Sequence, residues 1–195
     1  ACINYALDKM NFEKLGVDSD WVVGPSLWGT FKKLGIPEEN LDEAVNLYRE
    51  RYNVKGYLEN SVYVGIPGQL AMLLEMGYVL SLATSKPTVS ASAILEYFDL
   101  TKYFSYEFGS NLDGSLSDKS VLLKHALAVT GFEPNNALMI GDRQYDIIGA
   151  KSNLIKSVGV SYGYGSTNEL REAGADLLID KPAELAKAVQ KLLPI

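Results

Sequence analysis

The chain has 195 residues, 47% of them hydrophobic, so it can bury one good core and a smaller appendage but not two large domains. Its net charge of −6 leaves no basic face for nucleic acid, which we exclude as a partner, while small phosphorylated substrates stay allowed. A single cysteine, Cys2, excludes an internal disulfide, and no apolar run is long enough to cross a membrane. Because the first residues lack a signal-peptide pattern, we expect a cytoplasmic protein with no membrane partner.

The first sixty residues have helical patterns and no convincing strand. One expected helix face carries Ile3, Ala6, Leu7 and Met10. A second helix starts after Pro37-Glu38-Glu39, and its apolar face carries Leu41, Ala44, Val45, Tyr48 and Tyr52. Residues 1–62 are therefore expected to form a small helical domain, with its boundary in the stretch from 59 to 65.

From about Pro67 onward, helix and strand patterns alternate. Helices are expected at 67–76, 88–97 and 118–130, and strands at 78–83, 104–108, 137–140, 155–160 and 176–179. A helix follows each of the last three strands, and one of these helices opens with the capping box Ser166-x-x-Glu169. This alternation predicts an α/β fold in which a doubly wound parallel sheet spans residues 63–195, with helices on both faces.

Two carboxylates lie where the strand at 137–140 turns into a helix. Gly141 permits a tight turn, Asp142 stands at the carboxyl end of the strand, and Asp146 follows about one helical turn later. Open α/β sheets bind ligands at that edge, and Mg²⁺ needs few protein carboxylates because it keeps waters and takes phosphate oxygens. Asp142 and Asp146 are candidate Mg²⁺ ligands. In the alternative interpretation, Asp142 only caps the helix and Asp146 is a solvated side chain.

Two further signals fall on the same edge of the expected sheet. The strand at 78–83 is followed by Thr84-Ser85-Lys86-Pro87, where a hydroxyl and the N–H groups entering the next helix are placed to hold a phosphoryl oxygen. Lys119 opens the helix after the loop 109–118, within reach of the same anion. Taken singly, the hydroxyls are also ordinary helix caps and the lysine a solvated charge. Their order along the chain favours a phosphate site.

That order resembles motifs two, three and four of the haloacid dehalogenase superfamily of phosphatases. The similarity covers nearly the whole chain and is closest to the phosphoglycolate phosphatase and 5′-nucleotidase-like branch, in the stretches "ATSKP", "GSNLDGSLSDK", "GDRQYDIIGAK" and "GVSYGYGSTNELREAGAD". The resemblance implies a Mg²⁺-dependent phosphomonoester hydrolase that acts on a small phosphorylated metabolite, such as phosphoglycolate, a nucleotide or a sugar phosphate. It also implies an aspartyl-phosphate intermediate. We expect a monomer or a dimer.

The same resemblance assigns roles to residues of this sequence. It makes residues 1–62 a helical cap over the α/β core, Thr84 a phosphate-binding residue, and Lys119 the residue that steadies nucleophile and phosphate. Asp142 would ligate Mg²⁺, and Asp146 would support the metal shell directly or through water. The expected substrate-binding residues are Ser85, Lys86 and Arg49. For Arg49, a solvated arginine on a helix is the alternative interpretation.

The first motif of the family, a strand ending in Asp-x-Asp-Gly-Thr, has no clear counterpart in the chain. Asp18 and Asp20 have the spacing but follow no strand, and the stretch NLDGSL begins with Asn111, whose amide cannot act as a nucleophile. We therefore expect the chain as written to lack the nucleophilic aspartate and the first core strand, and to be inactive alone. The strands at 78–83 and 137–140 would then leave unpaired backbone edges. The alternative is a truncated, catalytically inactive relative that acts as a binding or scaffold module.

Overall fold

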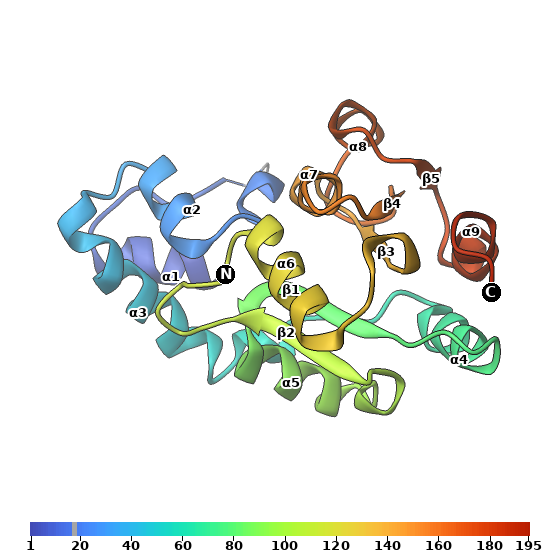
Figure 1. The fold of residues 1–195 in the computed structure, drawn as a ribbon. Helices are drawn as coiled ribbons and strands as arrows, with labels where there is room; N and C mark the ends of the chain where they lie inside the picture. Colours follow the sequence, from blue (N-terminus) through green and yellow to red (C-terminus); the bar gives the residue numbers. More distant parts are fainter. Residues whose placement is uncertain (17–18) are drawn as a thin grey trace. The chain divides into compact units, whose positions relative to one another are not determined.

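The computed structural model describes residues 1–16 and 19–195, which divide into two compact units, Ala1–Ser61 and Val62–Ile195 (Figure 1). We call them unit 1 and unit 2. Asp18, half of the Asp-x-Asp spacing considered above, lies outside the described residues. In the part of the chain that the structure describes, every helix is too short or too polar to cross a membrane.

The described part of unit 1 is helical and contains no strand. Its helices are α1 (Cys2–Lys9), α2 (Leu27–Lys33) and α3 (Leu41–Tyr52), with short 3-10 turns at Asp20–Val22, Glu38–Asn40 and Gly56–Leu58. Ser26 caps α2 because its Oγ accepts a hydrogen bond from the Gly29 N–H at 3.1 Å. The helices share one apolar cluster, whose most deeply buried members are Ala6, Leu7, Phe31, Ala44 and Val45. The expected apolar faces of α1 and α3 are confirmed by this burial.

Unit 2 alternates strands and helices, as expected. Its described strands are β1 (Ser81–Pro87), β2 (Tyr106–Ser110), β3 (Leu138–Gly141), β4 (Lys156–Val160) and β5 (Leu177–Ile179). The helices are α4 (Ile66–Glu75), α5 (Thr88–Tyr97), α6 (Lys119–Thr130), α7 (Gln144–Ser152), α8 (Thr167–Ala173) and α9 (Leu185–Leu192). All strand pairs are parallel, and the described strands form two sheets, β1-β2 and β3-β4-β5. The α/β class with parallel strands is confirmed.

Successive residues of β3 pack on opposite faces of the sheet. Leu138 and Ile140 contact a cluster that α4 and α9 share with β4 and β5. Met139 instead joins the cluster that contains Leu123 of α6 and Ala150 of α7. Because a strand presents alternate side chains to its two faces, this division shows that helices cover both faces (Figure 1). The arrangement is the doubly wound one.

The first strand differs from its expected position. We predicted a strand at 78–83, but β1 runs from Ser81 to Pro87. The earlier residues still terminate α4, because Gly77 has a φ of 92° and the Tyr78 N–H donates to the Leu73 carbonyl at 3.1 Å. The Thr84-Ser85-Lys86-Pro87 stretch is therefore part of the strand. We had expected it to supply the N–H groups of a helix entrance, but α5 begins only at Thr88.

Candidate functional site

The Thr84–Lys86 stretch is an irregular part of β1. The β1-β2 register is regular from Ser81 to Ala83 and shifts before Pro87. The Lys86 N–H donates to Thr84 Oγ1 at 3.2 Å, and the Ser85 hydroxyl donates to the Ser117 carbonyl at 3.0 Å. Irregularities of this kind re-aim side chains at the end of a strand. Here the Ser85 hydrogen bond ties the end of β1 to the loop that leads into α6.

Lys119 is buried at the start of α6. Only 8% of the residue is exposed, so the interpretation as a solvated charge is wrong. Its Nζ donates to the Ala83 carbonyl of β1 at 2.8 Å and lies 3.0 Å from Asp146 Oδ1. Asp118 caps the helix by accepting hydrogen bonds from the N–H groups of Ser120 and Val121. The lysine thus joins β1 to the start of α7, and its charge is neutralised by a carboxylate.

Asp146 lies in the first turn of α7 and is also buried. While Oδ1 pairs with Lys119, Oδ2 accepts the Arg143 N–H at 3.2 Å. The carboxylate packs so closely on β3 that a Cβ added to Gly141 would lie 2.3 Å from the Asp146 Cβ. Asp146 is therefore not a solvated side chain, and both of its oxygens already have partners within the protein.

Asp142 follows directly after β3 and lies against the turn after β4. Its Oδ2 accepts the Tyr164 N–H at 2.8 Å. A Cβ on Gly163 would lie 2.3 Å from the Asp142 Cβ, and one on Gly165 would lie 1.9 Å from the Asp142 carbonyl oxygen, so this approach requires glycine. Arg143, not Asp142, is the N-cap of α7, so the capping interpretation of Asp142 is wrong.

Electrostatic interactions link Lys86 to the same edge. Although the Lys86 residue is exposed, desolvation lowers the pKa of its ammonium; the charge of Asp142 opposes that shift, and the like charge of Lys119 adds to it. The charge of Asp142 also helps to raise the pKa of two tyrosines, Tyr63 and Tyr162. Burial is the largest cause in both cases and, with contributions from Tyr63 and Asp142, raises the pKa of Tyr162 to about 12. The Tyr63 and Tyr162 rings pack edge to face, 5.3 Å apart. The charge of Asp142 therefore acts on the Lys86 ammonium and on both members of this aromatic pair.

The oxygen donors at this edge fit Mg²⁺. Across the described residues, no group of three or more His, Cys, Asp or Glu side chains is arranged to hold a metal ion. Asp142 still offers a carboxylate at a strand end, and Mg²⁺ needs only one or two carboxylates because waters and phosphate oxygens complete its octahedron. Asp146, whose oxygens meet Lys119 and the Arg143 N–H, is better arranged to support the site than to bind the ion.

Sequence reasoning missed the partly buried ion pair between Arg143 and Glu169. Arg143 Nε donates to Glu169 Oε1 at 2.8 Å, and the same oxygen accepts the Gln144 N–H at 2.9 Å. Partial burial acts to raise the pKa of Glu169, but the hydrogen bonds from Gln144 and Arg143 outweigh it and lower the pKa. In the expected capping box, Ser166 Oγ does accept the Glu169 N–H, whereas the Glu169 carboxylate serves α7 instead. Only the box pattern itself had pointed to Glu169.

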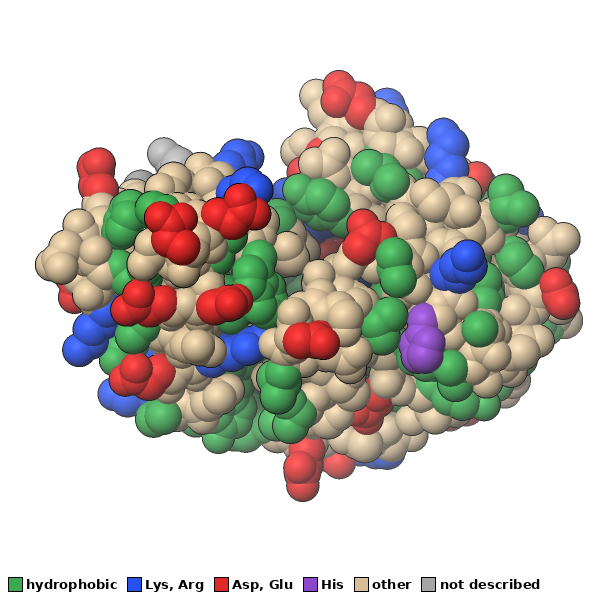
Figure 2. Space-filling view, turned by 60° about the vertical axis from the view of Figure 1, so that its left-hand side comes forward, with side chains coloured by type: hydrophobic (Ala, Val, Ile, Leu, Met, Phe, Trp, Pro, Cys, Tyr) green, Lys and Arg blue, Asp and Glu red, His purple; other side chains and the backbone are tan. Residues whose placement is uncertain are grey.

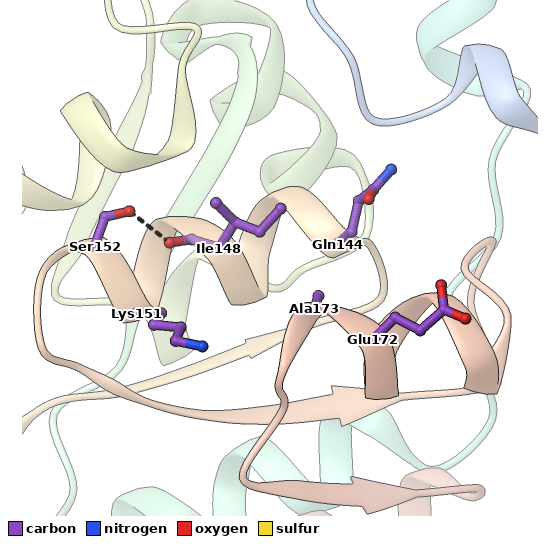
Figure 3. Close-up of a pocket in the computed structure, with 6 residues that line it drawn as sticks. All are labelled: Gln144, Ile148, Lys151, Ser152, Glu172 and Ala173. Carbon is purple, nitrogen blue, oxygen red and sulfur yellow. Dashed lines mark hydrogen bonds between the residues drawn. The ribbon is translucent and has the colours of Figure 1, made fainter.

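Three further features each lie within one of the two units. Arg49 belongs to unit 1, where its guanidinium lies 5.3 Å from the centre of the Trp28 ring. His125, the only histidine of the chain, is exposed on α6 and visible at the surface in Figure 2. A shallow groove between α7 and α8 is lined by Gln144, Ile148, Lys151, Ser152, Glu172 and Ala173 (Figure 3). None of the residues predicted for the site lines this groove.

Comparison with known proteins adds family relationships to this geometry. Residues 1–160 match a family model described as haloacid dehalogenase-like hydrolase. A 5′-nucleotidase of Pseudomonas aeruginosa is 41% identical over 165 residues, which cover 81% of this chain and 75% of that protein. The tyrosine-protein kinase PtkA of Mycobacterium tuberculosis is 38% identical over 144 residues, 74% of this chain, and the match spans 49% of the kinase.

Two solved structures that are described as phosphatases are also similar to this chain. The crystal structure of a predicted phosphatase from Clostridium acetobutylicum superposes with a TM-score of 0.94 at 40% identity, covering 98% of this chain and 89% of that one. A putative phosphatase from Clostridium difficile gives a TM-score of 0.82 at 38% identity, over 96% of this chain and 88% of the other.

Proposed function

Because the chain belongs to the haloacid dehalogenase-like hydrolase family, we propose that it is a Mg²⁺-dependent phosphomonoester hydrolase. The observation that carries this proposal is the meeting of Lys119 with both the end of β1 and Asp146, next to Asp142 at the end of β3. A cation and carboxylates gathered at the carboxyl edge of a parallel sheet suit a phosphoryl group. Unit 1 would serve as the helical cap.

Each residue of the edge has a role on this proposal. Thr84, next to the carbonyl that holds Lys119, would donate its hydroxyl to a phosphoryl oxygen. Lys119 would offset the negative charge of the nucleophile and of the phosphate, while Asp146 keeps the ammonium in place. Asp142 would hold Mg²⁺, which supplies charge neutralisation to the phosphoryl oxygens when bound. The described residues thus bind and orient the phosphate.

The attacking carboxylate is a separate part of the proposal. Both oxygens of Asp146 have protein partners, and Asp142 is assigned to the cation, so neither is the nucleophile. Among the described strands, β1 pairs only with β2 and β3 only with β4, although Ala83 of β1 packs in one cluster with Met139 of β3. A parallel strand between them would satisfy both edges. We assign the nucleophilic aspartate to such a strand, outside the printed residues.

With that aspartate present, the reaction would have two steps. A carboxylate oxygen attacks phosphorus as the ester P–O bond breaks, and the leaving oxygen takes one proton to depart as an alcohol, leaving an aspartyl-phosphate. Water then gives up one proton and attacks the same phosphorus, the P–O bond to the aspartate breaks, and inorganic phosphate and the free carboxylate result, so the two protons balance. Thr84 and Lys119 would contact the phosphoryl oxygens in both steps, and the contacts of Lys119 with Ala83 and Asp146 would hold its ammonium beside β1.

The proposed substrates are small phosphorylated metabolites. The 5′-nucleotidase relative, together with a phosphoglycolate phosphatase of Pseudomonas aeruginosa that is 27% identical over 164 residues, supports nucleoside monophosphates and phosphoglycolate as the first compounds to test. Sugar phosphates belong to the same class. Lys86, whose pKa responds to the charge of Asp142, would contact the substrate, and Ser85 would line the site while its hydroxyl holds the loop before α6. Arg49 is proposed as a contact from the cap.

Phosphate release by the full-length protein tests this function. We expect hydrolysis of at least one of these phosphomonoesters with Mg²⁺ and none with a chelator. Thr84→Val should slow turnover about 100-fold, the effect of losing one transition-state donor. Thr130→Val is the matched control, because the Thr130 hydroxyl donates to the Ala126 carbonyl within α6. No release from any compound, with Mg²⁺ still bound, would favour the non-catalytic binding module.

A further inference from the structure

The Glu169 carboxylate is anchored to the two residues that follow Asp142. Its Oε1 accepts hydrogen bonds from Arg143 Nε at 2.8 Å and from the Gln144 N–H at 2.9 Å. The Arg143 and Glu169 side chains are only 9% and 21% exposed. One carboxylate oxygen therefore holds both a side chain and the backbone of the turn between β3 and α7.

The turn that leads from β4 to α8 meets the other side of Asp142. Tyr164 donates its N–H to Asp142 Oδ2, and Gly163 and Gly165 let the backbone approach too closely for any Cβ. Ser166 then caps α8 by accepting the Glu169 N–H at 3.1 Å. The turn and Glu169 thus belong to one short segment. Tyr164 of this segment contacts the Asp142 side chain, and Glu169 contacts the residues that follow Asp142.

The ion pair is poorly explained by stability alone. Arg143 is buried but Glu169 is partly exposed, so the attraction between their charges is screened by solvent and offset by the desolvation of Arg143, which leaves little net stability. Orientation explains it better, since the pair and the Gln144 N–H contact together fix the backbone on which Asp142 stands. Hydrogen-bonded partners of this kind tune the affinity of a metal ligand.

We propose that Glu169 is a positioning residue: through Arg143 and Gln144 it fixes the Asp142 carboxylate against the Tyr164 N–H and orients it for a divalent cation. The inference rests on the proposed function in one respect, the role of Asp142 toward Mg²⁺. It adds a residue from α8 to a site otherwise built from β1, α6, β3 and α7. Glu169 itself touches neither the cation nor the substrate.

Two variants and one control test the proposal in the full-length protein. Glu169→Ala removes both contacts, and Glu169→Gln keeps an oxygen for the Gln144 N–H but loses the charge that pairs with Arg143. Glu172→Ala removes an exposed carboxylate three residues further along α8, in the groove of Figure 3, and leaves Arg143 paired. Thermal melts of all three report whether the fold is kept.

Two measurements read the position of Asp142. Calorimetric titration with MgCl₂ should show an affinity about tenfold weaker in Glu169→Ala, a smaller loss in Glu169→Gln and wild-type affinity in Glu172→Ala. Turnover at saturating Mg²⁺ should fall far less than the affinity. Amide hydrogen exchange at Tyr164, without Mg²⁺, should be faster in Glu169→Ala than in wild type and unchanged in Glu172→Ala.

The outcomes separate this proposal from the proposed function. Faster exchange at Tyr164 together with weaker Mg²⁺ binding supports it. Unchanged exchange overturns it, and so does faster exchange with wild-type Mg²⁺ affinity, because Glu169 would then be merely structural. If the wild-type protein binds no Mg²⁺, the proposed function fails, while the exchange rates still decide whether Glu169 holds Asp142 in place.

Discussion

The two units of the chain differ in whether they bury charged side chains. In the described part of unit 1, the ion pairs are largely exposed, as in Lys14–Asp8, where the side chains are 58% and 59% exposed. In unit 2, the Lys119–Asp146 side chains are 7% and 12% exposed. The charged residues found buried in the described structure, Lys119, Arg143 and Asp146, all belong to unit 2.

This difference separates what stabilises a fold from what a site requires. Unit 1 is stabilised by apolar burial in one cluster around Phe31 and Leu7, and its surface charges contribute little. Unit 2 has similar apolar clusters but also keeps costly charges at one edge of its sheets. Charges that are buried at a cost and gathered at the carboxyl edge of parallel strands mark a candidate functional site.

The largest expected effect comes from breaking the buried pair in unit 2. Lys119→Ala should lower the free energy of unfolding by about 4 kcal/mol, because it leaves the Asp146 carboxylate buried without its cation. Far-UV circular dichroism during urea unfolding measures the loss. Lys124→Ala, at an exposed lysine of the same helix, should change little. A similar small effect for both would erase the contrast between the units.

An apolar truncation in unit 1 should come next. Leu7 is 1% exposed, and Leu7→Ala should lower the free energy of unfolding by about 3 kcal/mol, because the change removes buried surface and leaves a cavity. The two tryptophans of the chain, Trp21 and Trp28, both lie in unit 1, so their fluorescence follows this unit in a urea titration. Leu58→Ala, at a residue 40% exposed, is the control and should cost clearly less.

The smallest effect should come from the Arg51–Glu59 pair of unit 1, whose side chains are 22% and 45% exposed. The hydrogen bonds from Arg51 lower the pKa of Glu59, so the pair contributes above the carboxyl pKa of the unfolded chain. This contribution is lost as the pH falls through the lowered pKa of the folded state. Glu59→Gln should therefore be slightly less stable than wild type at neutral pH and equal to it in acid. A loss as large as that for Lys119→Ala would contradict the comparison.

The sequence predicted what depends on local pattern. Alternating apolar residues located the strands and helices of unit 2, and the order of Thr84, Lys119 and Asp142 along the chain identified the edge where charges gather. The extension of β1 to Pro87 escaped prediction, because the left-handed Gly77 lets Tyr78 bond back to α4 and delays the strand. Local pattern does not encode such a tertiary choice.

Contacts between residues far apart in the sequence were the other feature that could not be predicted. Asp146 was expected near the metal, but its partner Lys119 lies 27 residues earlier, and periodicity gives no information on which cation a carboxylate meets. Glu169 was noticed for a capping box, and its carboxylate turned out to bond Arg143 and Gln144. The close approach of Gly163 to Asp142 is likewise a property of packing and not of sequence spacing.

Calorimetric titration of the full-length protein with MgCl₂ tests the central claim most directly, namely that Asp142 takes the cation while Asp146 neutralises Lys119. Asp142→Asn should lose Mg²⁺ binding, whereas Asp146→Asn should still bind the ion with affinity reduced about tenfold. Asp176 accepts hydrogen bonds from Ser157 of β4, so Asp176→Asn should bind Mg²⁺ like wild type. Wild-type Mg²⁺ affinity in Asp142→Asn, or equal losses in Asp142→Asn and Asp146→Asn, would contradict the account.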